Sequence, residues 1–219
     1  MRALRIVHLS DLHLSKSNSY ETNMVLQSLV PDIKNRLRDL DSADTYIAIS
    51  GDLTYSGTSE EFELLRDFTN RLKVAANTNN VIFAPGNHDL CWSSHPLENA
   101  DLMDDLVERG SDGIVKVERR FQSPIDRSLL LAGMSTYYDF TKSIGQDFSE
   151  YLYSLHSLKM ERFKVNFISL NSAFLFSKKF NYYGYIGKMQ LERATAESDA
   201  RGDFPEDFRV FNIMIFVFV

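Results

Sequence analysis

The chain has 219 residues, a length that suits one α/β domain with a sizeable hydrophobic core. Hydrophobic residues make up 44% and charged residues 25%, close to the globular average, which excludes the disordered and fibrous classes. A formal net charge of −6 excludes an extended basic surface that would hold nucleic acid through its phosphates. A single nucleotide remains admissible where divalent metal ions supply the positive charge.

Cysteine content and hydropathy bear on the compartment. Cys91 is the only cysteine, which excludes an intrachain disulfide framework and a cysteine-rich zinc site and favours a reducing compartment. Residues 1–9 lack an apolar stretch long enough for a secretory leader. The most apolar segment, 210–219, falls well short of the roughly 20 residues that span a bilayer as a helix. We therefore expect a cytoplasmic protein without a membrane span.

The first 90 residues predict strands that alternate with helices. Short apolar runs typical of buried strands are 4–9, 46–49 and 81–84. Apolar residues at helical spacing predict a helix over 20–40, with a kink or break at Pro31. A second helix is expected after Thr58, which forms a capping-box pattern with Glu61. Strands joined by helices predict a parallel sheet.

The second half of the chain is harder to interpret. We expect residues 91–163 to form an inserted, largely helical cap within a single domain that covers 1–219. Residues 163–170 are strand-like, 189–200 have a helical pattern, and the apolar run 209–219 predicts a terminal strand. No internal repeat or low-complexity segment is found.

A short polar motif follows each of the first three predicted strands. The motifs are Asp11-Leu12-His13, Gly51-Asp52-Leu53 and Gly86-Asn87-His88-Asp89. The carboxyl ends of parallel strands lie at one edge of a sheet, so these side chains are expected to gather there. In an extended chain, Asp11 and His13 point the same way and can reach one ion together. Two neighbouring ions need a carboxylate between them, for which Asp52 is suited. The glycines allow tight turns and close backbone approach.

With these motifs, residues 4–90 resemble the calcineurin-like metallophosphoesterases, whose pattern is Asp-x-His, Gly-Asp and Gly-Asn-His-Asp or Glu. The Asp-Leu-His-Leu and Gly-Asp-Leu-Thr wording is most similar to the cyclic-nucleotide phosphodiesterase branch. The resemblance implies a layered α/β/β/α sandwich. It also implies hydrolysis of phosphate mono- or diesters by a metal-activated hydroxide that attacks phosphorus in line. Manganese, iron or zinc would suit the mixed ligands, and two ions are expected.

Site roles follow from the same resemblance. It implies that the first ion is held by Asp11 and His13, that Asp52 bridges both ions, and that Asn87 binds the second. His88 would contact the phosphate and assist the leaving oxygen, and Asp89 would orient the His88 ring.

The chain departs from the family pattern in its later histidines. The family completes its site with three further histidines, whereas the last histidine here is His156. We therefore expect a C-terminally truncated or frame-shifted version of a longer enzyme. Among the remaining histidines, His8 is expected to be a hydrogen-bonded core or edge residue and His156 a structural residue of the cap. His95 could reach the site from a loop, although a surface position is favoured.

Three hypotheses follow. The first is a cytoplasmic phosphoesterase that acts on phosphate esters, nucleotides among them. The second is a catalytically impaired remnant that binds metal or nucleotide weakly or serves as an interaction module. In that case the strand over 209–219 could pair with a second copy, because an uncovered sheet edge invites association. The third, an unrelated α/β binding protein, requires the ordered motifs to match by chance.

Overall fold

A parallel sheet forms first along the chain. The computed structural model describes residues 3–17, 20–38, 43–148, 150–159, 164–177, 184–201 and 207–212. Its first sheet has the order β1-β2-β3 and consists of β1 (Ala3–Ser10), β2 (Ala43–Ser50) and β3 (Val81–Ala84). All its pairings are parallel, as the sequence predicted. The three polar motifs therefore follow the carboxyl ends of adjacent strands.

Two helices connect these strands and pack against each other, α1 (Tyr20–Leu37) and α2 (Ser59–Ala76). The predicted capping box at the start of α2 is confirmed, with Glu61 N–H donating to the Thr58 hydroxyl. Of the kink or break predicted at Pro31, the break is wrong, because α1 continues through this residue. Proline removes one hydrogen bond, and the apolar residues of α1 that pack on the core lie on both sides of it, which favours one continuous helix.

A second sheet with mixed strand directions follows. It has the order β4-β5-β6 and consists of β4 (Tyr153–Lys159), β5 (Lys164–Leu170) and β6 (Asp207–Asn212). The β4 and β5 strands are antiparallel, whereas β5 and β6 are parallel. The strand predicted over 209–219 begins within β6, and its residues 213–219 lie outside the described part of the chain. Self-association through this strand stays a prediction.

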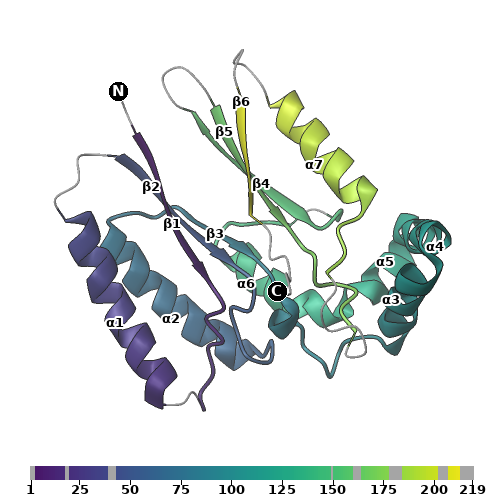
Figure 1. Ribbon diagram of the computed structural model, residues 1–219, viewed down its shortest axis with the longest axis horizontal. Helices are drawn as coiled ribbons and strands as arrows, with labels where there is room; N and C mark the ends of the chain where they lie inside the picture. The colour runs from purple at the N-terminus through teal and green to yellow at the C-terminus, as the bar shows by residue number, and fades with distance from the viewer. Residues whose placement is uncertain are drawn as a thin grey trace.

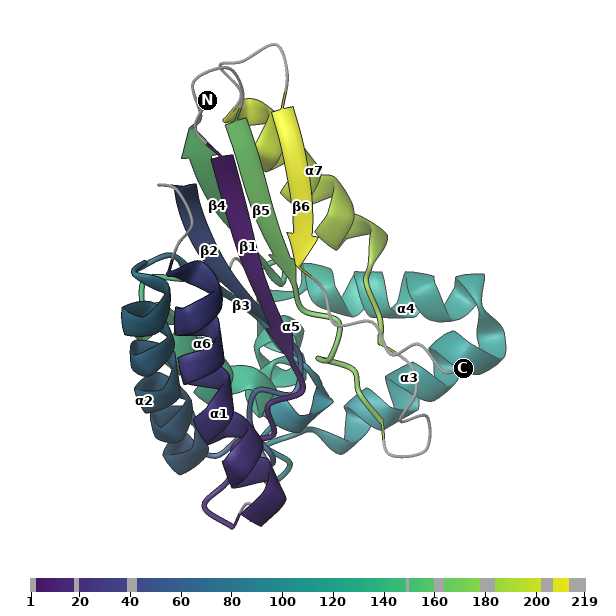
Figure 2. The ribbon, with the colours of Figure 1, turned by 60° about the vertical axis from the view of Figure 1, so that its left-hand side comes forward.

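The two sheets lie face to face, each covered by helices on its outer side (Figure 1). Tyr46, Ala48 and Ile82 of the first sheet form one cluster with Val165 and Phe167 of the second. The rings of Tyr46 and Phe167 stack with their centroids 4.6 Å apart. Helices α1 and α2 cover the first sheet, and α7 (Lys188–Ala200) covers the second (Figure 2). The predicted α/β/β/α layering is confirmed.

A group of short helices connects the two sheets and lies to their side (Figure 1). The helical elements are η1 (Asn87–Asp89), α3 (Leu97–Arg109), α4 (Ser111–Gln122), α5 (Pro124–Leu130), η2 (Ala132–Met134) and α6 (Ser135–Ser143). Helix α6 returns to the main core, where Phe140 contacts the rings of Phe62 and Phe83. No helix in the described residues is both long and apolar enough to cross a membrane.

The predicted cap over 91–163 is too long. Its last part contains β4, which belongs to the second sheet and not to the helical group. The sequence hides this strand because Tyr153 and Leu155 pack toward α7, whereas Leu158 packs between the sheets. With apolar residues on both faces of a partly exposed edge strand, the alternation expected of a strand is lost.

Candidate metal centre

The loops after β1 and β2 are hydrogen-bonded to each other beyond the ends of their strands. Asp11 N–H donates to the carbonyl of Gly51 at 3.1 Å, and His13 N–H donates to the carbonyl of Asp52 at 2.9 Å. The parallel pairing of β1 with β2 thus continues into the two polar motifs. The first and second motifs are consequently fixed in register with each other.

These loops adopt a left-handed backbone at three polar residues. Among the described residues, five that are not glycine have positive φ, and three of them are Asp11 (56°), His13 (44°) and Asp52 (47°). The premise that 11–13 is extended is therefore wrong. Such a conformation costs roughly 1–2 kcal/mol per residue and persists where surrounding structure enforces it, often at functional sites. Here the enforcing structure is the bonding between the two loops.

His13, Asp52 and His88 bring their side chains to one point. One ligand atom from each lies within 4.8 Å of the others, and His13 Nε2 is 3.8 Å from Asp52 Oδ2. Burial raises the pKa of Asp52 above its usual range, and the charge of Asp11 adds to this effect. His88 N–H and the imidazoles of His13 and His88 oppose the rise.

The chemistry of these side chains suits a divalent ion. His13 Nδ1 is buried and has no hydrogen-bond partner in the described structure, so this ring has an unused donor or acceptor. Asp52 is a buried carboxylate beside a second acidic group, Asp11, and a cation would offset both charges. Imidazole nitrogens with carboxylate oxygens suit a transition metal. These residues therefore fit the divalent metal ion that the sequence motifs imply.

Asp11 and Asn87, the other two predicted ligands, are not among the three residues of this cluster. Asp11 is exposed, and Asn87 is half-buried at the start of η1. His88 was not predicted to be a ligand, yet it is the third member of the cluster. Its position follows from its main chain, whose N–H donates to Asp52 Oδ1 at 3.0 Å.

The ring of His88 is held by the main chain of Tyr55. Its Nδ1 lies 2.7 Å from the carbonyl oxygen of Tyr55. A carbonyl oxygen can only accept, so Nδ1 carries the proton and Nε2 is the nitrogen left for the site. The ring also meets that of His13 edge to face, with centroids 4.7 Å apart. Tyr55, which the sequence analysis did not select, thus sets the tautomer of His88.

Asp89 does not orient the ring of His88, and that prediction is wrong. Its carboxylate accepts hydrogen bonds from the N–H groups of Leu53, Thr54 and Gly86 and from the Thr54 hydroxyl, at 2.8 to 3.2 Å. The side chain is fully buried, and this burial raises the pKa of Asp89 to about 7 against the lowering effect of the main-chain bonds. Asp89 therefore joins the loops after β2 and β3. Asp89 directly follows His88 in the sequence, and this adjacency does not reveal that its carboxylate bonds the loop after β2.

The predicted importance of glycine in the motifs is confirmed by the geometry. Gly51 has a φ of 70°, which favours glycine. Gly86 has ordinary φ, but a Cβ atom there would lie 2.2 Å from Asp52 Oδ1 and 2.3 Å from Asp52 N. The third motif can approach the second only because residue 86 has no side chain.

The other histidines lie outside the cluster. His8 bonds the Ser50 hydroxyl at 2.6 Å, as expected of a hydrogen-bonded edge residue. His95 is half-buried, with Nε2 3.0 Å from the Phe176 carbonyl, so it neither reaches the site nor lies on the surface. His156 is structural, but on β4 and not in a cap, 3.1 Å from the Tyr46 hydroxyl.

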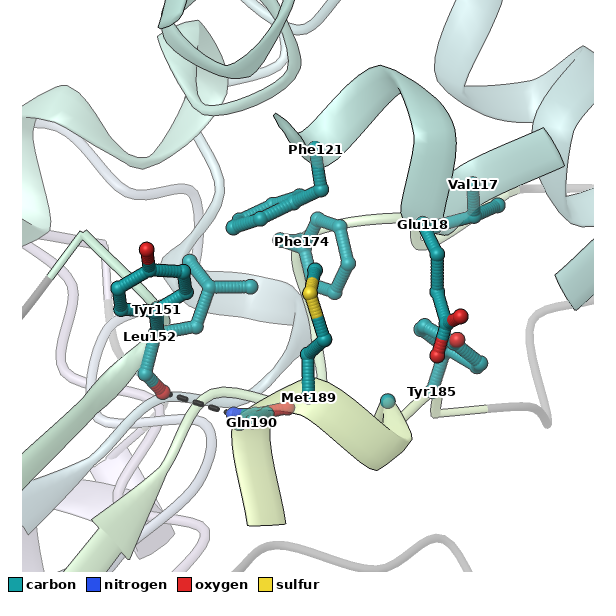
Figure 3. A pocket seen from close by; sticks show the side chains of 10 residues that line it. Val117, Glu118, Phe121, Tyr151, Leu152, Phe174, Tyr185, Met189 and Gln190 are labelled. Atoms are coloured by element: carbon teal, nitrogen blue, oxygen red, sulfur yellow. Dashed lines mark hydrogen bonds between the residues drawn. The ribbon is translucent and has the colours of Figure 1, made fainter. Parts of the chain in front are cut away.

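A separate cavity lies between α4, α7 and the loop before β4 (Figure 3). It is mostly apolar, and its lining residues are Val117, Glu118, Phe121, Tyr151, Leu152, Phe174, Tyr185, Gly187, Met189 and Gln190. None of the predicted site residues belongs to it. Its volume of about 20 Å³ has room for a single water molecule. The polar strand ends, and not this cavity, are the candidate site.

Comparison with known families agrees with the geometry. The model of the family described as calcineurin-like phosphoesterase matches residues 4–185. The match extends well beyond the three motifs and takes in the helical group, β4 and β5. No curated protein matches the chain.

Proposed function

The chain belongs to the calcineurin-like phosphoesterases, and on this basis we propose that it hydrolyses phosphate mono- or diesters with the help of divalent metal ions. The observation that carries the proposal is the meeting of His13, Asp52 and His88 within 4.8 Å at the ends of three adjacent strands. Residues that come from three separate motifs converge on one point only in the folded chain.

We assign the metal ligands by their position in the loops. Asp11, His13 and Asp52 would hold the first ion, and Asp52 and Asn87 would hold the second. The mixture of imidazole, carboxylate and amide donors suits manganese, iron or zinc. When bound, the ions would activate water as a nucleophile near neutral pH and offset charge on the phosphoryl oxygens.

His88 would act on the phosphate and not on metal. Its Nδ1–H is committed to the Tyr55 carbonyl, so the ring presents Nε2 to the site. In the protonated ring Nε2–H would donate to a phosphoryl oxygen or to the leaving oxygen. His88 therefore supplies a positioned acid.

The cytoplasm is the compartment that we propose. Cys91 is a free thiol, within 3.2 Å of the Ser93 hydroxyl, which suits a reducing environment. Nucleotides are among the phosphate esters that we propose as substrates, and extended nucleic acid is not.

The test is hydrolysis of bis(p-nitrophenyl) phosphate and p-nitrophenyl phosphate, with chelator and with added Mn²⁺. We expect Mn²⁺-dependent release of p-nitrophenol that disappears in Asp52→Ala. Asp67→Ala is the matched control, because Asp67 is an exposed carboxylate on α2, and it should retain wild-type rates. Metal binding without turnover would favour the alternative, a weak metal- or nucleotide-binding or interaction module. Turnover that persists in Asp52→Ala would contradict the proposed centre.

A further inference from the structure

Tyr55 is an exposed aromatic residue beside the candidate metal centre. Tyr55 is 58% exposed, and no other Phe, Trp or Tyr among the residues whose burial the structure describes is exposed. The apolar surface of a tyrosine ring normally favours burial, and the other Phe, Trp and Tyr rings of described burial are buried or half-buried. An exposed ring next to the polar cluster is therefore available to contact a ligand bound there.

The ring of Tyr55 continues a row of rings that leads out of the cluster. The centroids of His13 and His88 are 4.7 Å apart, and those of His88 and Tyr55 are 5.5 Å apart with a tilt of 44°. The row thus runs from the half-buried His13 to the exposed Tyr55. A phosphate held at the cluster would have its ester group within reach of Tyr55.

The main chain holds Tyr55 in place on both sides. Its N–H donates to the Leu14 carbonyl at 3.1 Å, and its carbonyl accepts from His88 Nδ1 at 2.7 Å. The preceding residue, Thr54, is fixed by the Asp89 carboxylate. A ring on a fixed main chain loses little conformational entropy when a ligand packs on it, which is the property of an aromatic recognition surface.

We propose that the Tyr55 ring is a stacking surface for a planar aromatic group carried by the phosphate ester, either an aryl group or a nucleobase. This inference rests on the proposed function and narrows its substrate class. Stacking between aromatic rings adds affinity beyond the area that it buries. The Tyr55 ring would then select among phosphate esters. The main-chain carbonyl of residue 55 would still position His88 when the tyrosine side chain is replaced.

The experiment compares two phosphonates that the enzyme cannot hydrolyse, phenylphosphonate and cyclohexylphosphonate. Both offer the same anion and a six-membered ring, and only phenylphosphonate is planar and aromatic. Their Kd values are measured by calorimetry on the full chain with Mn²⁺. We expect the wild type to bind phenylphosphonate about three- to tenfold more tightly than cyclohexylphosphonate. The ratio should fall to about one in Tyr55→Leu and be kept in Tyr55→Phe.

Val74→Ala is the control, because Val74 is an exposed apolar residue on α2, and it should keep the wild-type ratio. Equal affinities in the wild type, absence of binding, or a ratio unchanged in Tyr55→Leu would each overturn the inference. A ratio lost in Tyr55→Phe would assign the preference to the hydroxyl and also overturn it. Failure of the proposed function is distinguishable, since it would be seen as absence of Mn²⁺-dependent hydrolysis.

Discussion

His88 Nδ1 and the carbonyl oxygen of Tyr55 are 2.7 Å apart, which joins the third motif to the loop that follows the second. The bond occupies Nδ1, so Nε2 is the ring nitrogen left for the cluster with His13 and Asp52. A neutral main-chain group thus fixes the orientation of a histidine that the sequence had paired with Asp89.

Substitution of His88 and of His13 should separate catalysis from metal binding. In His88→Ala we expect kcat for bis(p-nitrophenyl) phosphate to fall by about 10²–10⁴-fold, because a positioned acid is lost, with metal content near that of the wild type. In His13→Ala we expect metal content itself to fall. Elemental analysis of both proteins after dialysis checks this. A metal-depleted His88→Ala protein would mean that His88 is a ligand.

Divalent metal should stabilise the fold through Asp52. A ligand at 100 times its Kd adds about 2.7 kcal/mol, which corresponds to a rise in Tm of about 5–10 °C for a chain of this size. We expect that rise on addition of Mn²⁺ to the chelator-treated wild type and not in Asp52→Asn. Thermal unfolding followed by circular dichroism is the measurement. An equal rise in both proteins would place the stabilising ion elsewhere.

Gly86→Ala should damage the centre by steric overlap. The added Cβ would lie 2.2 Å from Asp52 Oδ1, so the loops must separate, at a cost of about 1–3 kcal/mol or more. Gly187→Ala is the matched control, since Gly187 has ordinary backbone angles and meets only the end of the Tyr185 side chain at 3.2 Å. The comparison is made by urea unfolding and Mn²⁺ binding. Comparable losses in the two variants would argue against close packing at Gly86.

Asp89→Asn should destabilise the protein although it is isosteric. Four donors point at the two carboxylate oxygens, and an amide would replace one acceptor with a group that donates. Leaving buried donors unpaired costs about 1–3 kcal/mol each, so we expect a loss of about 2–4 kcal/mol in the free energy of unfolding. Asp67→Asn on the exposed face of α2 should change it by less than about 0.5 kcal/mol.

Acid should destabilise the protein partly through His95. Burial lowers the pKa of His95 below 6.5, against the opposing effect of the Phe176 carbonyl, and Nδ1 is buried without a hydrogen-bond partner in the described structure. The unfolded ring takes up a proton as pH falls through about 6.5, whereas the folded ring stays neutral, so stability is lost below that pH. In chelator, the wild type should lose Tm between pH 7.5 and 5.5 more steeply than His95→Gln. If Tm falls equally with pH in the wild type and in His95→Gln, then His95 does not contribute to the acid destabilisation.

The sequence by itself determined the three parallel strands, the capped helix after Thr58 and the position of the polar motifs at the strand ends. These features depend on local patterns of apolar residues and on neighbours within a few positions, which a single sequence displays. The strand β4 was hidden because its apolar residues face two different layers of the fold.

Only the tertiary structure decided how the motif residues are used. The left-handed backbone at Asp11 and His13, the anchoring of His88 by Tyr55 and the bonding of Asp89 to Thr54 all depend on contacts between residues about 33 to 40 positions apart. The same residue types could form other hydrogen bonds between the three motif loops. The register between neighbouring loops selects the set of bonds that is observed. That register is fixed by the packing of the whole sheet, which no local pattern contains.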